Sequence, residues 1–241
     1  MAYQTVFKRY EIKYLLTQAQ KDAVMAAMKS HMAPDKYGRT TIRNIYFDTE
    51  NYRLIRRSIE KPAYKEKLRL RSYGCPVSGS PVFVELKKKY QDVVYKRRVA
   101  LPLDAALTWV CDRTPRDEPT QITREIDYFM DFYERLRPAM FLCYDRQAYY
   151  AMDGSDFRIT FDTDILCRQN DIRLDGEAPG TPILPPGLTL MEIKSPGSMP
   201  LWLAHTLTEN KIYKTSFSKY GIAYQTLIFT PQEVSYHGSN L

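Results

Sequence analysis

The chain has 241 residues, of which 44% are apolar and 26% charged, and its formal net charge is +7. This composition is typical of a folded globular domain and excludes intrinsic disorder or a collagen-like repeat. No apolar run approaches the roughly 20 residues that a membrane-spanning helix needs. Four charged residues within positions 1–14 argue against a secretory signal. We therefore expect one domain over residues 1–241, located in the cytoplasm.

Cysteine and histidine are sparse and widely spaced. The four cysteines form no Cys-x-x-Cys pair, so a disulfide framework or a structural zinc site is not expected. The three histidines, His31, His205 and His237, have no metal-ligand spacing. A histidine-based metal centre or a Ser-His-Asp triad therefore finds no support.

Periodicity predicts eight strands connected by helices and loops. In chain order, the strands are predicted at about 4–14, 40–48, 63–73, 81–89, 93–101, 139–151, 156–165 and 187–195. Helical spacing and capping residues predict helices at 18–32, 49–59, 104–111, 120–136 and 201–209. Turn-forming residues predict loops at 74–81, 153–155 and 175–187. The apolar stripes of the helices are typical of faces that cover a core.

Positive charge is concentrated between residues 53 and 98. This window holds fourteen lysines and arginines but four acidic residues, a net charge of +10, so the rest of the chain sums to −3. Such a local excess indicates a polyanionic partner or substrate. The alternative interpretation is a solvated basic surface.

Strand periodicity bears on this choice, because successive side chains in a strand point to opposite faces. In the strand 63–73, one face carries four cations, Lys65, Lys67, Arg69 and Arg71. Four more segments separate charged from apolar side chains in the same way, and their charged faces carry Glu11 and Lys13; Glu85, Lys87 and Lys89; Arg158, Thr160, Asp162 and Asp164; and Glu192 and Lys194. By the same parity, Lys88 and Arg97 are predicted on the exterior.

Eight antiparallel strands can close into a barrel wide enough for one extended ligand. Closure turns the basic faces inward and leaves the apolar faces to be covered by helices. Because buried unpaired cations are costly, such an interior requires an anion, water and metal. The sequence therefore predicts an α+β fold: an eight-stranded antiparallel closed β-barrel with helices packed outside.

Several motifs follow one another along the chain: Glu11-x-Lys13, then the segments 44–49, 68–74, 84–87, 96–98, 144–146, 158–163, 191–194 and 216–221. In this order they resemble the VTC domain, the polyphosphate polymerase branch of the triphosphate tunnel metalloenzymes (CYTH-like superfamily). The resemblance extends from about Phe7 to Tyr224. The chain is similar to a stand-alone bacterial-type domain, since it has no room for the regulatory domain or membrane helices of eukaryotic VTC subunits.

The resemblance implies a tunnel that binds ATP or another triphosphate together with Mn²⁺ or Mg²⁺. It implies transfer of the terminal phosphate to polyphosphate or pyrophosphate. The residues implied to be catalytic are Lys65, Arg69, Arg71, Lys87, Arg146 and Arg158. Those implied to bind substrate phosphates are Lys13, Lys96, Lys194, Ser218 and Lys219. Glu192 is the implied metal ligand, with Glu11 and Glu85 as second choices.

Phosphoryl transfer needs positioned cations and a hard metal, and no general base when the acceptor is an ionised phosphate. Three hypotheses remain open: a polyphosphate polymerase, a triphosphatase in which Glu11, Glu85 or Asp162 positions water, and a non-catalytic polyphosphate or nucleic-acid module. Nucleic acid is disfavoured, because the charged face of residues 65–71 lacks aromatic side chains for base stacking. Lys67 is expected inside or at the mouth, and the segment with Ser218 and Lys219 is either part of the site or a plain capped helix.

Overall fold

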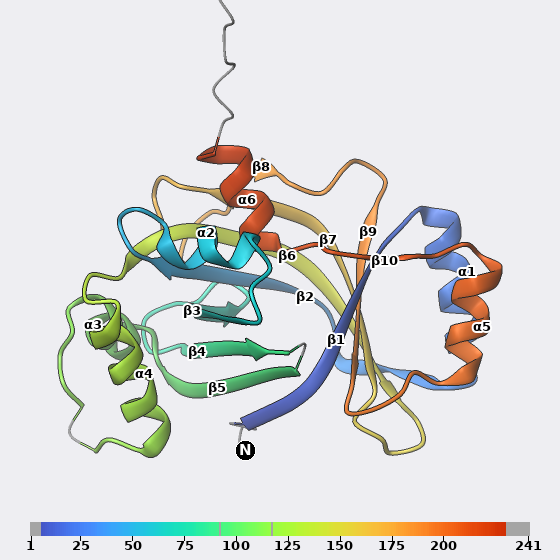
Figure 1. Cartoon of the computed structure of the whole chain (residues 1–241), viewed down its shortest axis with the longest axis horizontal. Helices are drawn as coiled ribbons and strands as arrows, with labels where there is room; N and C mark the ends of the chain where they lie inside the picture. Colours follow the sequence, from blue (N-terminus) through green and yellow to red (C-terminus); the bar gives the residue numbers. More distant parts are fainter. Residues whose placement is uncertain (1–5, 92, 117, 230–241) are drawn as a thin grey trace, which may run out of the picture.

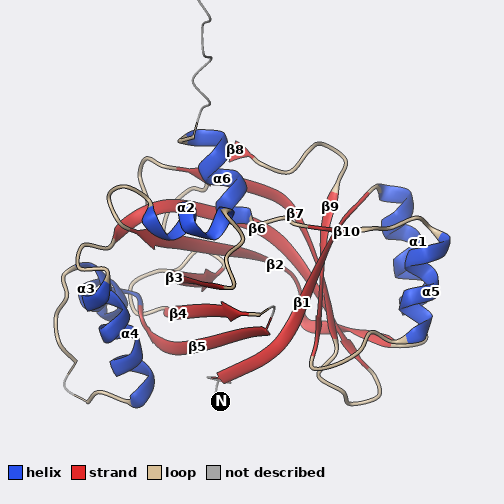
Figure 2. Ribbon diagram, viewed as in Figure 1, coloured by secondary structure: helices blue, strands red, loops and turns tan. Residues whose placement is uncertain are grey.

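The computed structural model describes residues 6–91, 93–116 and 118–229, with side chains from Tyr10 onward. Its ten strands are β1 (Val6–Leu16), β2 (Met32–Asp48), β3 (Tyr64–Tyr73), β4 (Pro81–Tyr90), β5 (Val93–Pro102), β6 (Arg137–Ala151), β7 (Arg158–Arg168), β8 (Thr181–Pro182), β9 (Thr189–Ser195) and β10 (Lys214–Thr215) (Figures 1 and 2). In the same part of the chain, the six helices are α1 (Gln18–Met28), α2 (Arg53–Ile59), α3 (Leu103–Cys111), α4 (Gln121–Phe132), α5 (Leu201–Glu209) and α6 (Lys219–Leu227).

The strands form one antiparallel sheet. Its order is β10-β1-β5-β4-β3-β2-β6-β7-β8, and β9 pairs with both β1 and β7. The N-terminal part of β1 pairs with β5, whereas the part from Tyr10 to Leu16 pairs with β9. The long strands thus follow the order β1, β5, β4, β3, β2, β6 and β7, with β9 beside both β1 and β7. The predicted closed barrel is not confirmed.

Helices pack against the sheet at three places (Figure 1). Leu68 and Leu70 of β3 are fully buried in a cluster that includes Trp109 of α3 and Phe129 of α4. A second cluster joins α2 and α6 to β2 and β6, and a third joins α1 and α5 to β1, β7 and β9. The first and third clusters use the apolar side of their strands, so the charged side chains of those strands point to the opposite face. The second cluster lies on that opposite face, since its members Tyr46 and Tyr144 also line the cavity described below.

Local sequence explains where the helices begin. Thr17 caps α1, since its side chain accepts a hydrogen bond from the backbone N–H of Gln20 and the Gln20 side chain accepts one from the Thr17 N–H. Thr120 caps α4 in a similar way through the N–H of Thr123. Both caps agree with the predicted helix starts.

The α+β fold, the antiparallel sheet and the eight long strands are confirmed, although residues 4 and 5 of the first predicted strand lie outside the described residues. The predicted helix 18–32 was too long: α1 ends at Met28, and Met32, Ala33 and Pro34 pair with β6. The predicted helix 120–136 was also too long, because α4 ends at Phe132 and Glu134 adopts a φ of 56°. Among the described residues, no helix is long and apolar enough to span a bilayer. A single domain stays a prediction.

Candidate functional site

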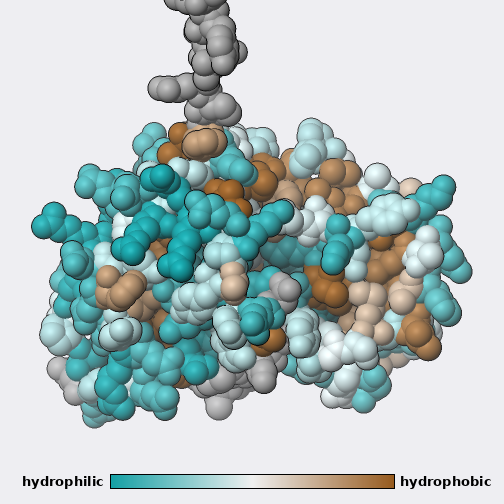
Figure 3. Space-filling model, in the orientation of Figure 1, coloured by the Kyte–Doolittle hydropathy of each residue, from teal (hydrophilic) through white to brown (hydrophobic). Residues whose placement is uncertain are grey.

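A cavity of about 1150 Å³ lies on the charged face of the sheet and is lined by β1, β2, β3, β4, β5, β6, β9 and the segment that leads into α6. Its wall includes thirteen cationic residues, namely Lys13, Lys61, Lys65, Lys67, Arg69, Arg71, Lys87, Lys89, Lys96, Arg146, Lys194, Lys214 and Lys219. Two carboxylates, Glu11 and Glu192, line the same wall. This excess of positive charge suits the cavity to a polyanion. In Figure 3, hydrophilic residues dominate the half of the visible surface over β3–β5, and more hydrophobic residues lie over α1 and α5.

The alternation predicted for β3 is confirmed. Lys65, Lys67, Arg69 and Arg71 all line the cavity, while the intervening leucines are buried under the helices. Neutral side chains of neighbouring strands orient the two arginines. Arg69 Nη1 donates to the hydroxyl of Tyr46 at 3.1 Å. Arg71 donates to Asn44 Oδ1 at 2.9 Å and to the Tyr144 hydroxyl at 3.0 Å.

These three orienting residues had no predicted role. Asn44, Tyr46 and Tyr144 belong to the ordered motifs, but strand parity was applied there to charged residues alone. Ile45 and Phe47 pack in the α3–α4 cluster, so Asn44 and Tyr46 necessarily face the other side of β2. The same parity argument could therefore have placed both beside the arginines.

Glu85 is the centre of a buried ion cluster. Its carboxylate is fully buried and lies 2.7 Å from Arg69, 3.2 Å from Lys96 and 3.9 Å from Arg71, and it also accepts from Arg98 Nε at 2.7 Å. Burial raises the pKa of Glu85, but these four cations outweigh it and hold the pKa well below its usual range. Glu85 does not line the cavity. These contacts hold the cationic side chains of the wall in position. They give no support to the predicted role of Glu85 as a metal ligand.

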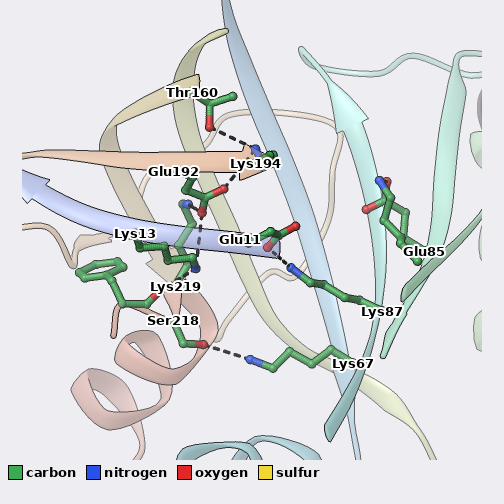
Figure 4. A network of polar contacts seen from close by, with 12 residues as sticks. Glu11, Lys13, Lys67, Glu85, Lys87, Thr160, Glu192, Lys194, Ser218 and Lys219 are labelled. Carbon is green, nitrogen blue, oxygen red and sulfur yellow. Dashed lines mark hydrogen bonds and ion pairs between the residues drawn. The ribbon is translucent and has the colours of Figure 1, made fainter. Parts of the chain in front are cut away.

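Glu192 of β9 is the centre of a second cluster, which opens onto the cavity (Figure 4). Its Oε1 lies 2.9 Å from Lys219 Nζ and 3.4 Å from Lys13 Nζ. Its Oε2 lies 3.2 Å from Arg146 and 3.4 Å from Lys194. Burial raises the pKa of Glu192, yet the surrounding cations lower it well below its usual range, so the carboxylate is ionised at neutral pH.

Asp162 of β7 supports this cluster from behind the cavity wall. Arg146 donates to both carboxylate oxygens of Asp162, at 2.6 and 2.7 Å, and Lys219 Nζ lies 2.6 Å from Oδ2. The carboxylate is fully buried, and its pKa is lowered because Arg146 and Lys219 outweigh the effect of burial. Asp162 had been assigned to the charged face, as an option for positioning water. The structure instead gives it the contacts of a residue that orients Arg146 and Lys219.

Glu11 of β1 is not part of the Glu85 cluster and forms its ion pair with a lysine of β4. Lys87 Nζ donates to Glu11 Oε2 at 2.6 Å, as Figure 4 shows. Burial raises the pKa of Glu11, but Lys87 and Lys194 lower it below its usual range. Lys194, whose Nζ also donates to Thr160 at 3.2 Å, lies opposite Glu11 in the pairing of β1 with β9.

The start of α6 completes the wall. Ser218 is the N-cap, and its Oγ accepts from the N–H of Gly221 at 3.2 Å and from Lys67 Nζ at 3.0 Å. Lys13 Nζ donates to the carbonyl oxygen of Phe217 at 2.6 Å. The segment is therefore both a capped helix and a part of the cavity, so the two alternatives for it are not exclusive.

Buried contacts fix the position of α6. The hydroxyl of Tyr220 donates to Asp48 Oδ2 at 2.9 Å, and its ring stacks on Tyr46 with a centroid separation of 4.7 Å. Asp48 also accepts the backbone N–H groups of Leu54 and Ile55 at the start of α2. One carboxylate thus connects α2 to the helix that carries Lys219.

Arg158 is one predicted site residue that the structure does not bring to the cavity. Its guanidinium lies 2.9 Å from Asp156 and stacks on Tyr150, with 4.6 Å from Cζ to the ring centroid. Arg158 has the predicted parity, but it is the first residue of β7 and does not line the cavity. The exterior positions are confirmed: Arg97 pairs with Glu125 of α4 at 3.0 Å, and Lys88 lines a small pocket on the same side.

A divalent cation fits this site when phosphate oxygens complete its coordination. No group of three or more His, Cys, Asp or Glu that could hold a metal occurs in the described part of the chain. Glu11 and Glu192 nevertheless offer two ionised carboxylates on adjacent strands of the cavity wall. Mg²⁺ is commonly bound by one or two carboxylates together with substrate phosphates. The donor set therefore suits a metal that arrives with a phosphate ligand.

Comparison with known families decides the classification. The family model described as "VTC domain" matches residues 8–228, nearly the whole chain. The chain belongs to the VTC domain family. The motif order predicted this family and closely predicted the extent of the match. No match was found among curated proteins.

Two solved structures have the same overall fold as this VTC domain. A candidate adenylate cyclase from Bacillus halodurans is 13% identical with a TM-score of 0.55, and the alignment covers 93% of this chain and 100% of that one. A candidate adenylyl cyclase from Hippeastrum, described as having a dominant triphosphatase activity, is 15% identical with a TM-score of 0.50, covering 90% and 96%. At these identities the two structures support the fold alone.

Proposed function

We propose that this VTC domain is a polyphosphate polymerase. It transfers the terminal phosphate of ATP, or of another triphosphate, to a growing polyphosphate chain in the basic cavity. The observation that carries this proposal is the composition of the cavity wall, where thirteen cationic residues accompany two carboxylates. Such an excess of positive charge needs a ligand with many negative charges, spaced along an extended chain.

The proposal includes a closed tunnel. The pairing of β9 with both β1 and β7 supports it, because the hydrogen-bonded path of the eight long strands returns to its start. A tunnel holds a linear phosphate chain in register with cations on all sides. It thereby limits the chain to one direction of approach toward the reacting phosphate.

The chain's own residues provide binding and alignment. Arg69 and Arg71 bind phosphate oxygens through guanidinium groups that Tyr46, Asn44 and Tyr144 hold in place. On the opposite wall, Arg146 and Lys219 are oriented by Asp162. These groups neutralise the charge on the equatorial oxygens of the transferred phosphate and align donor and acceptor. Lys65, Lys87, Lys96, Lys13 and Lys194 add point charges along the wall.

Glu192, with Glu11 as a second ligand, would hold the divalent metal, Mn²⁺ or Mg²⁺. When bound, the metal would supply positive charge that offsets the negative charge of the phosphates. Both carboxylates remain ionised at neutral pH because their pKa values are lowered, which is the protonation state that a hard cation needs. Glu85 has no such role in this proposal, since four cations surround it and it does not line the cavity.

The lowered pKa values also favour transfer to phosphate over transfer to water. A carboxylate with a lowered pKa is a weak base and activates water poorly. An ionised terminal phosphate is already a nucleophile and needs no base.

The second candidate function is a triphosphatase, which the activity described for the Hippeastrum structure favours.

Gel electrophoresis of the products tests the proposal. Purified protein is incubated with ATP and Mn²⁺, and the products are stained for polyphosphate. We expect a ladder of long chains with the wild type and a loss of at least about 100-fold in rate with Arg69→Ala. Arg97→Ala, on the exterior, should retain activity and serves as the matched control. Orthophosphate without a ladder would favour the triphosphatase, and full activity of Arg69→Ala would refute the site.

A further inference from the structure

Lys67 differs from three other lysines of the cavity wall in the type of group that it contacts. Lys13, Lys87 and Lys219 each lie within 3.4 Å of a carboxylate, whereas Lys67 Nζ donates to the neutral Oγ of Ser218 at 3.0 Å. In Figure 4 the Lys67 side chain reaches from β3 to Ser218, away from Glu11 and Glu192. Among residues 6–91, 93–116 and 118–229, no ion pair joins Lys67 to a carboxylate, unlike its three counterparts.

The groups that face Lys67 are predominantly cationic. Lys65 and Arg69 flank it on β3, Lys87 is its register partner on β4, and Lys13 faces it from β1. From α6 it meets Ser218 and the ring of Tyr220, whose centroid lies 6.0 Å from Nζ. Burial, and then repulsion by these four cations, lowers the pKa of Lys67 well below its ordinary value.

The contact with Ser218 is compatible with either protonation state of Lys67. Ser218 Oγ already accepts the N–H of Gly221, and it can accept from an ammonium group or donate to a neutral amine. A carboxylate partner would instead favour the ammonium form. The Ser218 hydroxyl therefore holds the Lys67 side chain in place without fixing its protonation state. That state can change when an anion binds in the cavity.

We propose that Lys67 binds the phosphate chain and takes up one proton from solvent as it does so, changing from a neutral amine to an ammonium group. One N–H bond forms on Lys67, and the bond that held this proton on hydronium or on the buffer acid breaks, so no oxidation state changes. The phosphate oxygens would place negative charge beside Lys67, whose neighbours in the described part of the chain include Ser218 and four cations. This inference rests on the proposed function for the class of ligand, a linear polyphosphate, but not for the reaction catalysed.

Calorimetry measures the proton directly. Inorganic tripolyphosphate is titrated into the full chain at pH 8.0 with EDTA, in Tris and in HEPES. The two buffers differ in heat of ionisation, so the difference in observed binding heat gives the number of protons exchanged. Protons that the ligand itself exchanges contribute to every variant. The difference between wild type and Lys67→Arg, which is charged at this pH, therefore isolates Lys67.

We expect wild type to take up about one proton more than Lys67→Arg, while Lys67→Arg still binds. Lys67→Met, which cannot be protonated, should lose the same proton and also bind more weakly. Lys88→Arg, on the outer side of β4, is the matched control and should behave as wild type. An equal proton count in wild type and both Lys67 variants would overturn this inference and leave the proposed function intact. Failure of tripolyphosphate to bind wild type would overturn both.

Discussion

Two buried glutamates, Glu85 and Glu192, have similar surroundings and different access to the cavity. Each lies within 4.0 Å of four cationic side chains. Glu85 is fully buried and absent from the cavity wall, whereas Glu192 is 7% exposed and lines it. The comparison teaches that a carboxylate among cations in this fold serves one of two purposes. Glu85 makes the cationic wall possible, and Glu192 is accessible to a ligand of that wall.

The largest expected effect is on stability, from Glu85→Gln. The substitution leaves four neighbouring cations without their shared anion, which costs about 3–5 kcal/mol because the group is fully buried. Urea unfolding followed by circular dichroism measures this loss. A change below about 1 kcal/mol would show that the cluster does not depend on Glu85.

Glu192→Gln should affect turnover more than stability. Asp162 remains beside Arg146 and Lys219, so those two cations keep a negative partner. We expect polymer formation to fall at least about 100-fold, because the proposed metal ligand and the orientation of the wall are lost. The stability loss should be smaller than that of Glu85→Gln, measured by the same urea unfolding. The reverse order of stability losses would contradict the distinction between the two clusters.

Lowering the pH should destabilise the folded protein, because Glu85 and Glu192 become protonated. The pKa values of Glu85 and Glu192 are lowered from an ordinary value of 4.5. Their stabilising contribution is therefore fully present above about pH 4.5 and is lost as the pH falls below it toward the folded-state values. The melting temperature of the wild type should drop steeply in this range, and that of Glu85→Gln less steeply. If the melting temperatures of wild type and Glu85→Gln fell equally with pH, the acid sensitivity would not come from protonation of Glu85.

Tyr220→Phe is a milder test of how α6 is held. It removes the hydrogen bond to Asp48 and keeps the stack on Tyr46, so we expect about 1 kcal/mol of destabilisation. Because Tyr220 positions the helix that carries Lys219, KM for the triphosphate should rise. Steady-state kinetics measure this, and an unchanged KM would show that the stacking alone positions α6.

The smallest effect is expected outside the cavity, from Arg97→Ala. Its ion pair with Glu125 is partly exposed, with 27% and 28% of the two side chains accessible, and pairs of this kind contribute about 0.2–1 kcal/mol. Urea unfolding should show a change within this range, and activity should not change. A large loss of activity would mean that the outer face takes part in function.

Much of this arrangement could be predicted from the sequence, because a strand's two faces alternate strictly. The four cations of β3 were placed on one wall by that rule, and Arg97 and Lys88 on the other side. Parity does not say how far along the wall a residue lies, so Arg158 was predicted in a site that it does not line. It also does not reveal which carboxylate is enclosed. Glu85 and Glu192 both follow the inward pattern, and their different exposure depends on strands far apart in sequence.

Helix ends were harder to predict for a similar reason. Pro34 ended the predicted helix 18–32, but β6 supplies pairing partners that extend β2 back to Met32. Those partners, Tyr149 to Ala151, are more than a hundred residues away in the chain. Local capping signals such as Thr17 were reliable because the groups that they satisfy are within three residues.

Phosphorus NMR of the wild type during incubation with ATP and Mn²⁺ tests the central claim most directly, because it distinguishes phosphates inside a chain from free phosphate. We predict growth of the internal polyphosphate resonance as the γ-phosphate resonance of ATP declines. Growth of the orthophosphate resonance alone would contradict a cavity that joins phosphates into a chain.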